Sequence, residues 1–133
     1  MIDETEINDF KALGLSSTTL EAIKDKGFER PTDIQKLCIP PLLKENGNLI
    51  GQAQTGTGKT AAFALPILEH INEKSKNTQA LVLVPTRELC MQVSEEIKSL
   101  AFNRKVSVAP IYGGASYSSQ FKALKDGCQI VVG

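Results

Sequence analysis

The sequence predicts an α/β fold in which a parallel sheet carries helices on both faces. Short apolar segments alternate with amphipathic helical patterns after residue 48, and this alternation is typical of a parallel sheet. Residues 80–84 are apolar throughout, as strands buried on both faces of such a sheet usually are. A Gly-rich loop around Gly56 and Gly58 lies between an apolar segment and a helical pattern, the setting of a phosphate-binding loop.

Length and charge limit the functions that the chain can have. Its 133 residues fit one domain, for which we expect a first segment at 1–47 and a βα core at 48–133. Lys+Arg and Asp+Glu number 15 each, so no overall field attracts nucleic acid. Any contact with RNA would come from a local patch, and would be weak and salt-sensitive.

Cysteines and the N-terminus suggest the compartment. Cys38, Cys90 and Cys128 lack the spacing of a metal site, and we interpret them as reduced thiols of a cytoplasmic protein. Residues 1–6 are acidic and polar, unlike a signal peptide. Because no apolar run approaches the roughly 20 residues of a membrane span, we expect no membrane partner.

Two helices are expected before the loop. The first would begin at Thr18, which has the spacing of a capping box with Glu21, and would end at Gly27. The second would begin at the capping box of Thr32 and Gln35. Pro40 and Pro41 would end its regular part. The expected inward residues, including an amphipathic lead-in, are Ile7, Phe10, Leu13, Leu20, Ile23, Ile34, Leu37 and Cys38.

Strands and helices alternate in the remainder. The expected strands are 49–53, 80–84, 106–111 and 130–132. The expected helices are 59 to about 73, 87 to about 100, and 116–125, the last ended by Gly127. Pro66 should kink the first of these. The helix from residue 87 would bury one side, made of Leu89, Val93, Ile97 and Leu100.

The phosphate loop combines residue types that suit a nucleotide. Gly56 and Gly58 would let backbone N–H groups converge at a helix N-terminus. Lys59 would reach the β/γ-phosphates, and Thr60 would offer its hydroxyl to Mg²⁺. Ala53 stands where the general pattern has glycine, and a Gly/Thr-rich surface loop is the alternative.

Four motifs, with Phe10 upstream, occur in a characteristic order. They are residues 27–35, the loop at 53–60, residues 85–89, and Gly113 with Gly114. In this order and spacing they resemble the first half of the N-terminal RecA-like domain of a DEAD-box ATP-dependent RNA helicase, over nearly the whole chain. The resemblance implies a RecA-like P-loop NTPase fold, here an incomplete domain, with ATP/ADP and Mg²⁺ as cofactors and RNA as a partner.

By this resemblance, Gln35 reads adenine, because its amide has a donor and an acceptor for the base edge. Phe28 would stack on the base, and Arg30 and Thr32 would line its pocket. Alternatively, Gln35 only completes the capping box, although both roles can hold, and Phe28 is a core aromatic. The other implied nucleotide contacts are Gln54, Thr55, Gly56, Thr57, Gly58, Lys59, Thr60 and Ala61.

The resemblance also implies an RNA contact at Arg87, with Pro85 and Thr86 shaping the turn. Gly113 and Gly114 would let an RNA backbone approach closely. The alternatives are a solvated arginine paired with a glutamate, and an ordinary glycine turn. Cys90 is expected to pack in the interior without taking part in chemistry. His70 is expected to have no catalytic or metal-binding role.

Several family motifs would follow Gly133: a Thr-Pro-Gly-Arg segment, the Asp-Glu-Ala-Asp and Ser-Ala-Thr motifs, and a second RecA-like domain with an arginine finger. We therefore expect a truncated piece of a helicase that binds nucleotide weakly and turns over essentially none. Uncovered apolar faces at Val82, Val84 and Val131, and an uncovered sheet edge, would favour self-association or low stability.

Two other functions stay open. One is a P-loop NTPase of different purpose, such as a DNA helicase, because contacts to a 2′-hydroxyl cannot be located in the sequence. The pocket of Gln35 and the 85–89 segment argue against it. The other is a non-catalytic module that responds to nucleotide or binds RNA.

Overall fold

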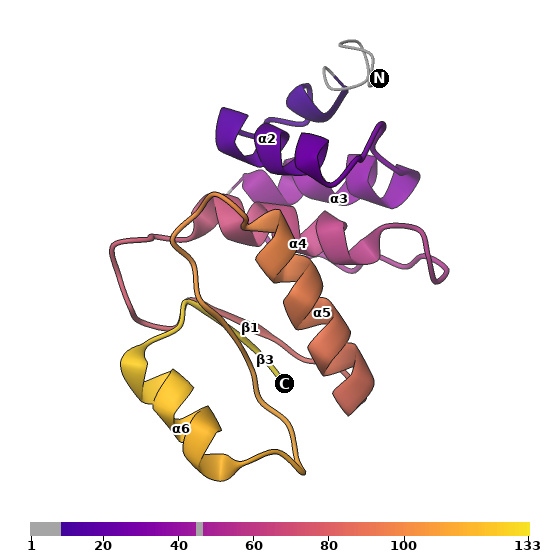
Figure 1. The fold of residues 1–133 in the computed structure, drawn as a ribbon. Helices are drawn as coiled ribbons and strands as arrows, with labels where there is room; N and C mark the ends of the chain where they lie inside the picture. The colour runs from indigo at the N-terminus through magenta and orange to yellow at the C-terminus, as the bar shows by residue number, and fades with distance from the viewer. Residues whose placement is uncertain (1–8, 45–46) are drawn as a thin grey trace. The chain divides into compact units, whose positions relative to one another are not determined.

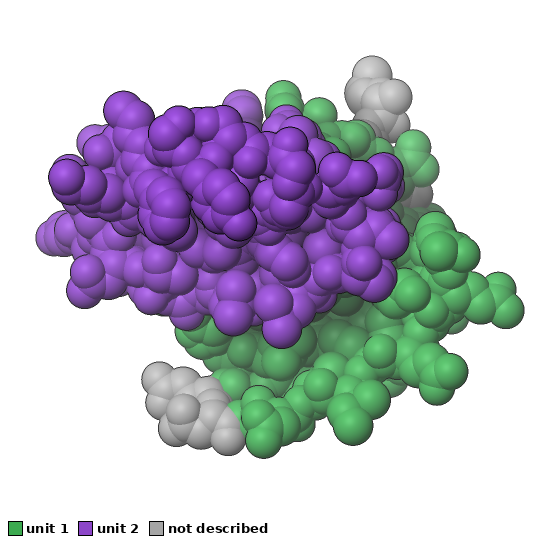
Figure 2. All heavy atoms as spheres, turned by 90° about the horizontal axis from the view of Figure 1, so that it is seen from below, with its two compact units in different colours: residues 1–70 green, residues 71–133 purple. Residues whose placement is uncertain are grey.

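The computed structural model describes residues 9–44 and 47–133 (Figure 1). Two compact units divide the chain between His70 and Ile71 (Figure 2). Unit 1 contains the helices and the phosphate loop, and unit 2 contains the sheet with its two helices. The sequence predicted a boundary between residues 47 and 48, before the phosphate loop. In the structure the boundary lies after His70, so the phosphate loop belongs to the same compact unit as the helices that precede it.

The described part of unit 1 includes the helices α2 (Ser17–Asp25), α3 (Asp33–Leu43) and α4 (Lys59–His70). Helices α3 and α4 pack against each other. The largest fully buried side chains of this unit include Phe10, Ile23, Ile39, Leu65 and Leu68. The expectation for Phe10 and Ile23 is thereby confirmed, whereas Ile7 lies outside the described residues.

The N-cap of helix α2 lies two residues before the expected Thr18. Its N-cap is Ser16, whose hydroxyl accepts from the Thr19 N–H, so the capping box at Thr18 and Glu21 was wrong. The Glu69 carboxylate of α4 accepts from both the Ser16 N–H (3.1 Å) and the Ser16 hydroxyl (2.8 Å), and also from the Thr19 hydroxyl. This tertiary contact favours Ser16 over the equally plausible local cap.

The C-terminus of α2 agrees with expectation. Gly27 has a φ of +74°, and its N–H donates to the Lys24 carbonyl while the Phe28 N–H donates to the Ile23 carbonyl. These are the two bonds of a Schellman motif, which needs a left-handed residue after the cap. The turn aims the chain toward the start of α3.

Helix α3 begins at the expected capping box but ends later. The Thr32 hydroxyl accepts from the Gln35 N–H, and the Gln35 side chain accepts from the Thr32 N–H. The expected end at Pro40 and Pro41 was wrong, because the helix continues to Leu43. The two prolines leave the carbonyls of residues 36 and 37 without their usual donors, but both residues are exposed to water. Leu37 was also misplaced, since it is 71% exposed.

Helix α4 runs continuously through Pro66 and ends at His70, earlier than expected. Beyond it, the Asn72 side chain accepts from the Lys74 N–H and forms a local turn that competes with the helix. The strand expected at 49–53 was wrong. The structure assigns no strand to this segment.

Unit 2 contains a parallel sheet of β1 (Ala80–Val82), β3 (Ile130–Val132) and β2 (Val108–Pro110), in that order. In Figure 1 the yellow C-terminal strand β3 lies beside β1. The end of β3 agrees with expectation, but β1 and β2 are shorter than the predicted runs 80–84 and 106–111. In the described sheet β1 and β2 each pair with β3. Because β3 has three residues, the paired segments of β1 and β2 are equally short.

Two helices connect the strands: α5 (Arg87–Leu100) and α6 (Tyr117–Asp126). The path from β1 to β2 crosses the sheet in one direction and the path from β2 to β3 returns, so right-handed crossovers place α5 and α6 on opposite faces. Helix α5 has its expected bounds, but Cys90 is buried in place of Leu89. Cys90 is spaced three and seven residues from Val93 and Ile97 and therefore shares their face.

One face of the sheet is more open than expected. Leu81 shares a face with Val131 and Ala109 in the strand register, and it is 64% exposed. Leu83 is 76% exposed, so the expectation of a strand buried on both faces was wrong. The uncovered residues are these two leucines, whereas Val82, Val84 and Val131 are half-buried.

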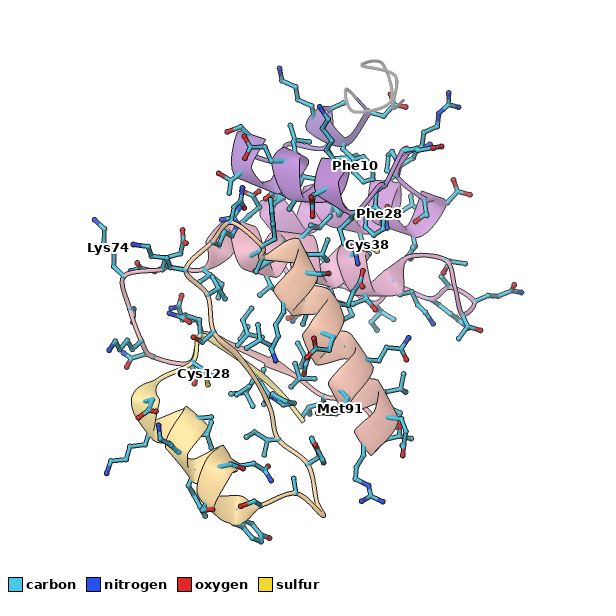
Figure 3. All side chains as sticks on the ribbon, in the orientation of Figure 1. Phe10, Phe28, Cys38, Lys74, Met91 and Cys128 are labelled. Atoms are coloured by element: carbon cyan, nitrogen blue, oxygen red, sulfur yellow. The ribbon has the colours of Figure 1, made fainter. Side chains whose placement is uncertain are left out.

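The three cysteines are all buried free thiols. Figure 3 shows Cys38 in the helical unit and Cys128 beside the start of β3. Among residues 9–44 and 47–133, no helix combines the length and apolar character that crossing a membrane requires.

Replacement of Gly127 should destabilise unit 2. Gly127 has φ +99° and ψ 132°, a region that only glycine readily adopts. An added Cβ would lie 2.7 Å from the Lys76 Cβ and 2.9 Å from its carbonyl oxygen. We expect Gly127→Ala to lower the free energy of unfolding by about 1–3 kcal/mol in urea titrations. Gly47→Ala is the control, because its added Cβ meets nothing within 4 Å; equal losses in both variants would contradict this account.

Candidate functional site

A cavity of about 500 Å³ in unit 1 brings together the turn after α2, the start of α3 and the phosphate loop. Its lining residues are Gly27, Phe28, Glu29, Arg30, Thr32, Gln35, Gly56 and Gly58. The four side chains expected to surround a base therefore line one space with two glycines of the loop. Gly27 and Glu29 belong to the 27–35 motif, but no role in the pocket was predicted for either residue.

The Gln35 amide joins the helix start to the phosphate loop. Its Oε1 accepts from the Thr32 N–H at 3.0 Å, and its Nε2 donates to the Gly58 carbonyl at 3.2 Å. The side chain is only 3% exposed. An amide has two acceptor lone pairs and two N–H donors, so these bonds leave one of each.

Glycine is required at Gly58 for two separate reasons. Its φ is +84°, which disfavours other residues. An added Cβ would also lie 2.4 Å from the Gln35 Nε2 and 3.2 Å from the Thr32 hydroxyl. Gly56 also has a positive φ, of +79°, and the Thr57 hydroxyl donates to the Gln54 carbonyl across the loop. The loop thus turns back on itself directly before α4.

Helix α4 starts at Lys59, and its first hydrogen bond runs from the Ala62 N–H to the Gly58 carbonyl. Lys59 is exposed and Thr60 half-buried, whereas Ala61 is buried. In the described part of the chain, neither the Lys59 ammonium nor the Thr60 hydroxyl has a hydrogen-bond or ion-pair partner. Both groups are therefore available to a ligand at the positive end of the helix.

Phe28 is half-buried at the cavity, with the Lys26 ammonium 5.7 Å from its ring centroid. Figure 3 shows it within the helical unit, on the turn that follows α2. Arg30 is exposed at the same opening. Phe28 is thus neither a fully buried core residue nor a fully solvated one.

A second arrangement lies in unit 2, after β1 and β2. Thr86 caps α5 by accepting from the Leu89 N–H at 3.1 Å, and Arg87 begins the helix. The Arg87 Nη1 lies 3.5 Å from the Gly113 carbonyl oxygen, at the limit of a hydrogen bond. A Cβ on Gly114, whose φ is +89°, would lie 2.6 Å from that nitrogen. The arginine therefore lies over the glycine turn; Pro85, beside the cap, is exposed.

Gln120 on α6 is a functional candidate that was not predicted from the sequence. Its Oε1 accepts from the Tyr112 N–H at 3.0 Å, and its Nε2 donates to the Tyr112 carbonyl at 3.1 Å. Tyr112 directly precedes Gly113 in the chain. A single glutamine in a polar helix carries no recognisable pattern, so only the structure places it here.

His70 and Cys90 both contact backbone carbonyl groups. The His70 Nε2 lies 3.0 Å from the Leu42 carbonyl oxygen. Within the described ranges, no three residues of the metal-binding types gather in one group. Cys90 is 1% exposed, and its Sγ donates to the Val132 carbonyl at 3.1 Å.

Comparison with known proteins identifies a family. The model of the DEAD/DEAH box helicases matches residues 32–133. A probable ATP-dependent RNA helicase of Methanocaldococcus jannaschii is 49% identical over 130 residues, which are 98% of this chain and 35% of that protein. The DEAD-box ATP-dependent RNA helicase CshA of Bacillus subtilis is 50% identical over 93% of this chain and 25% of its own length.

Solved structures agree. A DEAD box protein of Methanococcus jannaschii superposes with a TM-score of 0.89 at 50% identity, over 94% of this chain and 34% of that one. Dbp5 of S. cerevisiae, bound to RNA and ADP BeF3, superposes with a TM-score of 0.79 at 31% identity, over 94% of this chain and 31% of that one. The chain spans about a third or less of the length of these relatives. It has the RecA-like fold of their helicase domains, and it belongs to the DEAD/DEAH box helicase family.

Proposed function

We propose that this chain is the nucleotide-binding part of an ATP-dependent RNA helicase, which couples ATP binding and hydrolysis to RNA binding and local duplex unwinding. Relatives named as such helicases, and the related Dbp5 bound to RNA and ADP BeF3, support the proposal. The observation that carries it is the Gln35 amide, which joins the cavity lined by Phe28, Arg30 and Thr32 to the phosphate loop.

Gln35 recognises adenine with the amide N–H and the oxygen lone pair that are not used in its bonds to Thr32 and Gly58. Its Oε1 would accept from the exocyclic amine and its Nε2 would donate to a ring nitrogen. Guanine has a carbonyl oxygen in place of that amine, so the cavity favours adenine. Phe28 stacks on the base, and Arg30 and Thr32 complete the pocket. In this proposal the capping role of Gln35 orients its amide for the base.

The phosphates bind where α4 begins. Backbone N–H groups of residues 54–58 and 61 surround them, and the Lys59 ammonium neutralises the β/γ-phosphates. The Thr60 hydroxyl, an oxygen ligand of the kind that Mg²⁺ takes, holds the metal. Mg²⁺ held at Thr60 would supply positive charge against the charge of the phosphates. Lys59 and Thr60 act here by positioning and charge, which dominate phosphoryl transfer.

In this proposal unit 2 binds the sugar–phosphate backbone of RNA. Arg87 supplies a phosphate contact, with Pro85 and Thr86 shaping its turn. Gly113 and Gly114 present a surface without side chains, on which a sugar–phosphate backbone can lie closely. The short distance from Arg87 to the turn supports one combined contact. With a net charge of zero, RNA affinity should be weak and salt-sensitive.

The chain by itself binds nucleotide without turnover in this proposal, because hydrolysis needs groups from further motifs and from a second RecA-like domain. The parent protein acts in the cytoplasm. The exposed Leu81 and Leu83, together with the sheet edge, favour self-association of the isolated chain.

Adenine selectivity is testable with thermal shifts. A ligand that binds only the native state raises the unfolding midpoint, so ADP with Mg²⁺ should give a clear shift and GDP little. Gln35→Glu should weaken ADP binding about ten-fold or more, because it loses both amide donors. Gln92→Glu, at an exposed position of α5, is the charge-matched control. Equal shifts with ADP and GDP would refute the adenine assignment and leave the phosphate loop standing.

The phosphate role of Lys59 predicts a loss without base preference. Lys59→Ala should reduce the shifts caused by ADP and by GDP in the same proportion, since the ammonium contacts phosphate. Lys24→Ala removes an exposed lysine of α2 and is the matched control. If Lys59→Ala retained the full ADP shift, the loop would not be the phosphate site.

Turnover by the isolated chain should be at background. Phosphate release from ATP, measured with and without RNA on a pure sample, should equal that of Lys59→Ala. Steady-state hydrolysis well above this variant would refute the proposal that the chain lacks essential catalytic groups.

A further inference from the structure

The turn that carries Gly113 and Gly114 is tied at both ends to one side chain. Gln120 accepts from the Tyr112 N–H at 3.0 Å and donates to the Tyr112 carbonyl at 3.1 Å. The same Nε2 lies 3.5 Å from the Ser116 carbonyl oxygen, at the far end of the turn. The two glycines therefore lie between backbone groups that contact a single amide.

This contact restricts a segment that otherwise has much freedom. Gly113 and Gly114 are both exposed, and glycine has the widest backbone freedom of any residue. The N–H and C=O of Tyr112 belong to the two peptide planes on either side of its Cα. Holding both groups on one planar amide orients the peptide plane that leads into Gly113.

Gly113 and Gly114 are in turn the residues against which Arg87 lies. The Arg87 Nη1 is 3.5 Å from the Gly113 carbonyl oxygen, and it occupies the space that a Gly114 side chain would fill. A shift of the turn would therefore move the surface on which the guanidinium rests. Contacts run without interruption from Gln120 through Tyr112 and the glycines to Arg87.

Packing of α6 alone does not explain the placement of Gln120. Helix α6 has no buried residue, so apolar burial restrains it little. The Ser116 side chain at its N-cap makes no capping hydrogen bond. Under these conditions a bidentate amide contact is a strong restraint between the helix and the turn.

We propose that Gln120 is a positioning residue for RNA: it holds the glycine turn in the arrangement that lets Arg87 and the glycine backbone contact one sugar–phosphate segment. The proposal rests on the proposed RNA contact of Arg87. Gln120 acts through the turn and touches no RNA itself. Its contribution is to reduce the ordering that the turn requires on binding.

The test uses fluorescence anisotropy with a short fluorescein-labelled oligouridylate, at low ionic strength where weak binding is measurable. Arg87→Ala should lower affinity and reduce the salt slope by about one phosphate contact. Gln120→Leu, which keeps size but loses both hydrogen bonds, should lower affinity about two- to ten-fold. Gln92→Leu makes the same chemical change at an exposed position of α5 and should bind normally.

The double variant provides the decisive comparison. If Gln120 acts through the turn and Arg87, Gln120→Leu should cost little further affinity once Arg87→Ala is present. Additive losses would overturn the proposal, because Gln120 would then act elsewhere. Unchanged affinity in Gln120→Leu, with a loss in Arg87→Ala, would overturn it while leaving the RNA function standing. No loss in Arg87→Ala would refute the RNA contact itself, and the positioning role with it.

A second readout excludes a general loss of folding. The amide resonances of Gly113 and Gly114 should shift in Gln120→Leu without RNA, while those of the β3 core and the thermal midpoint stay near the unmodified values. Gln120→Asn retains the amide but is one methylene shorter, and it should reproduce both effects. Unshifted glycine resonances in these variants would also overturn the proposal.

Discussion

The Gln35 amide is the contact on which the geometry of unit 1 depends. It closes the capping box of α3 at Thr32 and at the same time bonds the Gly58 carbonyl, so the helix start and the phosphate loop are set by one planar group. A side chain at position 58 would clash with that amide. A cavity lined by the turn after α2 follows from this arrangement. The capping role of Gln35 is therefore compatible with the base contact that we propose, because backbone contacts leave part of the amide available.

Unit 2 contains a similar contact between a glutamine amide and the backbone. A glutamine amide again bonds backbone next to glycines, with Gln120 contacting both polar groups of Tyr112. Polar contacts matter here because packing is sparse: β3 provides only three residues for two neighbours, and α6 buries nothing. Both sites thus combine glycines, which permit close approach, with an amide that restricts the freedom the glycines bring.

Local chemistry was predictable where one residue type had one strong preference. The capping box at Thr32, the glycine end of α2 and the span of α5 were all anticipated, because caps and helical periodicity are short-range properties. Errors arose where the outcome depended on a distant partner. The N-cap of α2 is Ser16, which bonds the distant Glu69 carboxylate, and α4 provides that carboxylate from 53 residues away.

The sequence by itself determined the order of the motifs, and with them the α/β class and the family, because glycines, caps and charged residues at set spacings suit few other arrangements. Only the tertiary structure decided which side chains complete the sites. Leu81 reads as a core residue and is exposed, whereas Gln120 reads as a surface residue and holds a turn. The reason is that burial and amide pairing depend on which backbone groups come together in space, and residue spacing along the chain does not specify them.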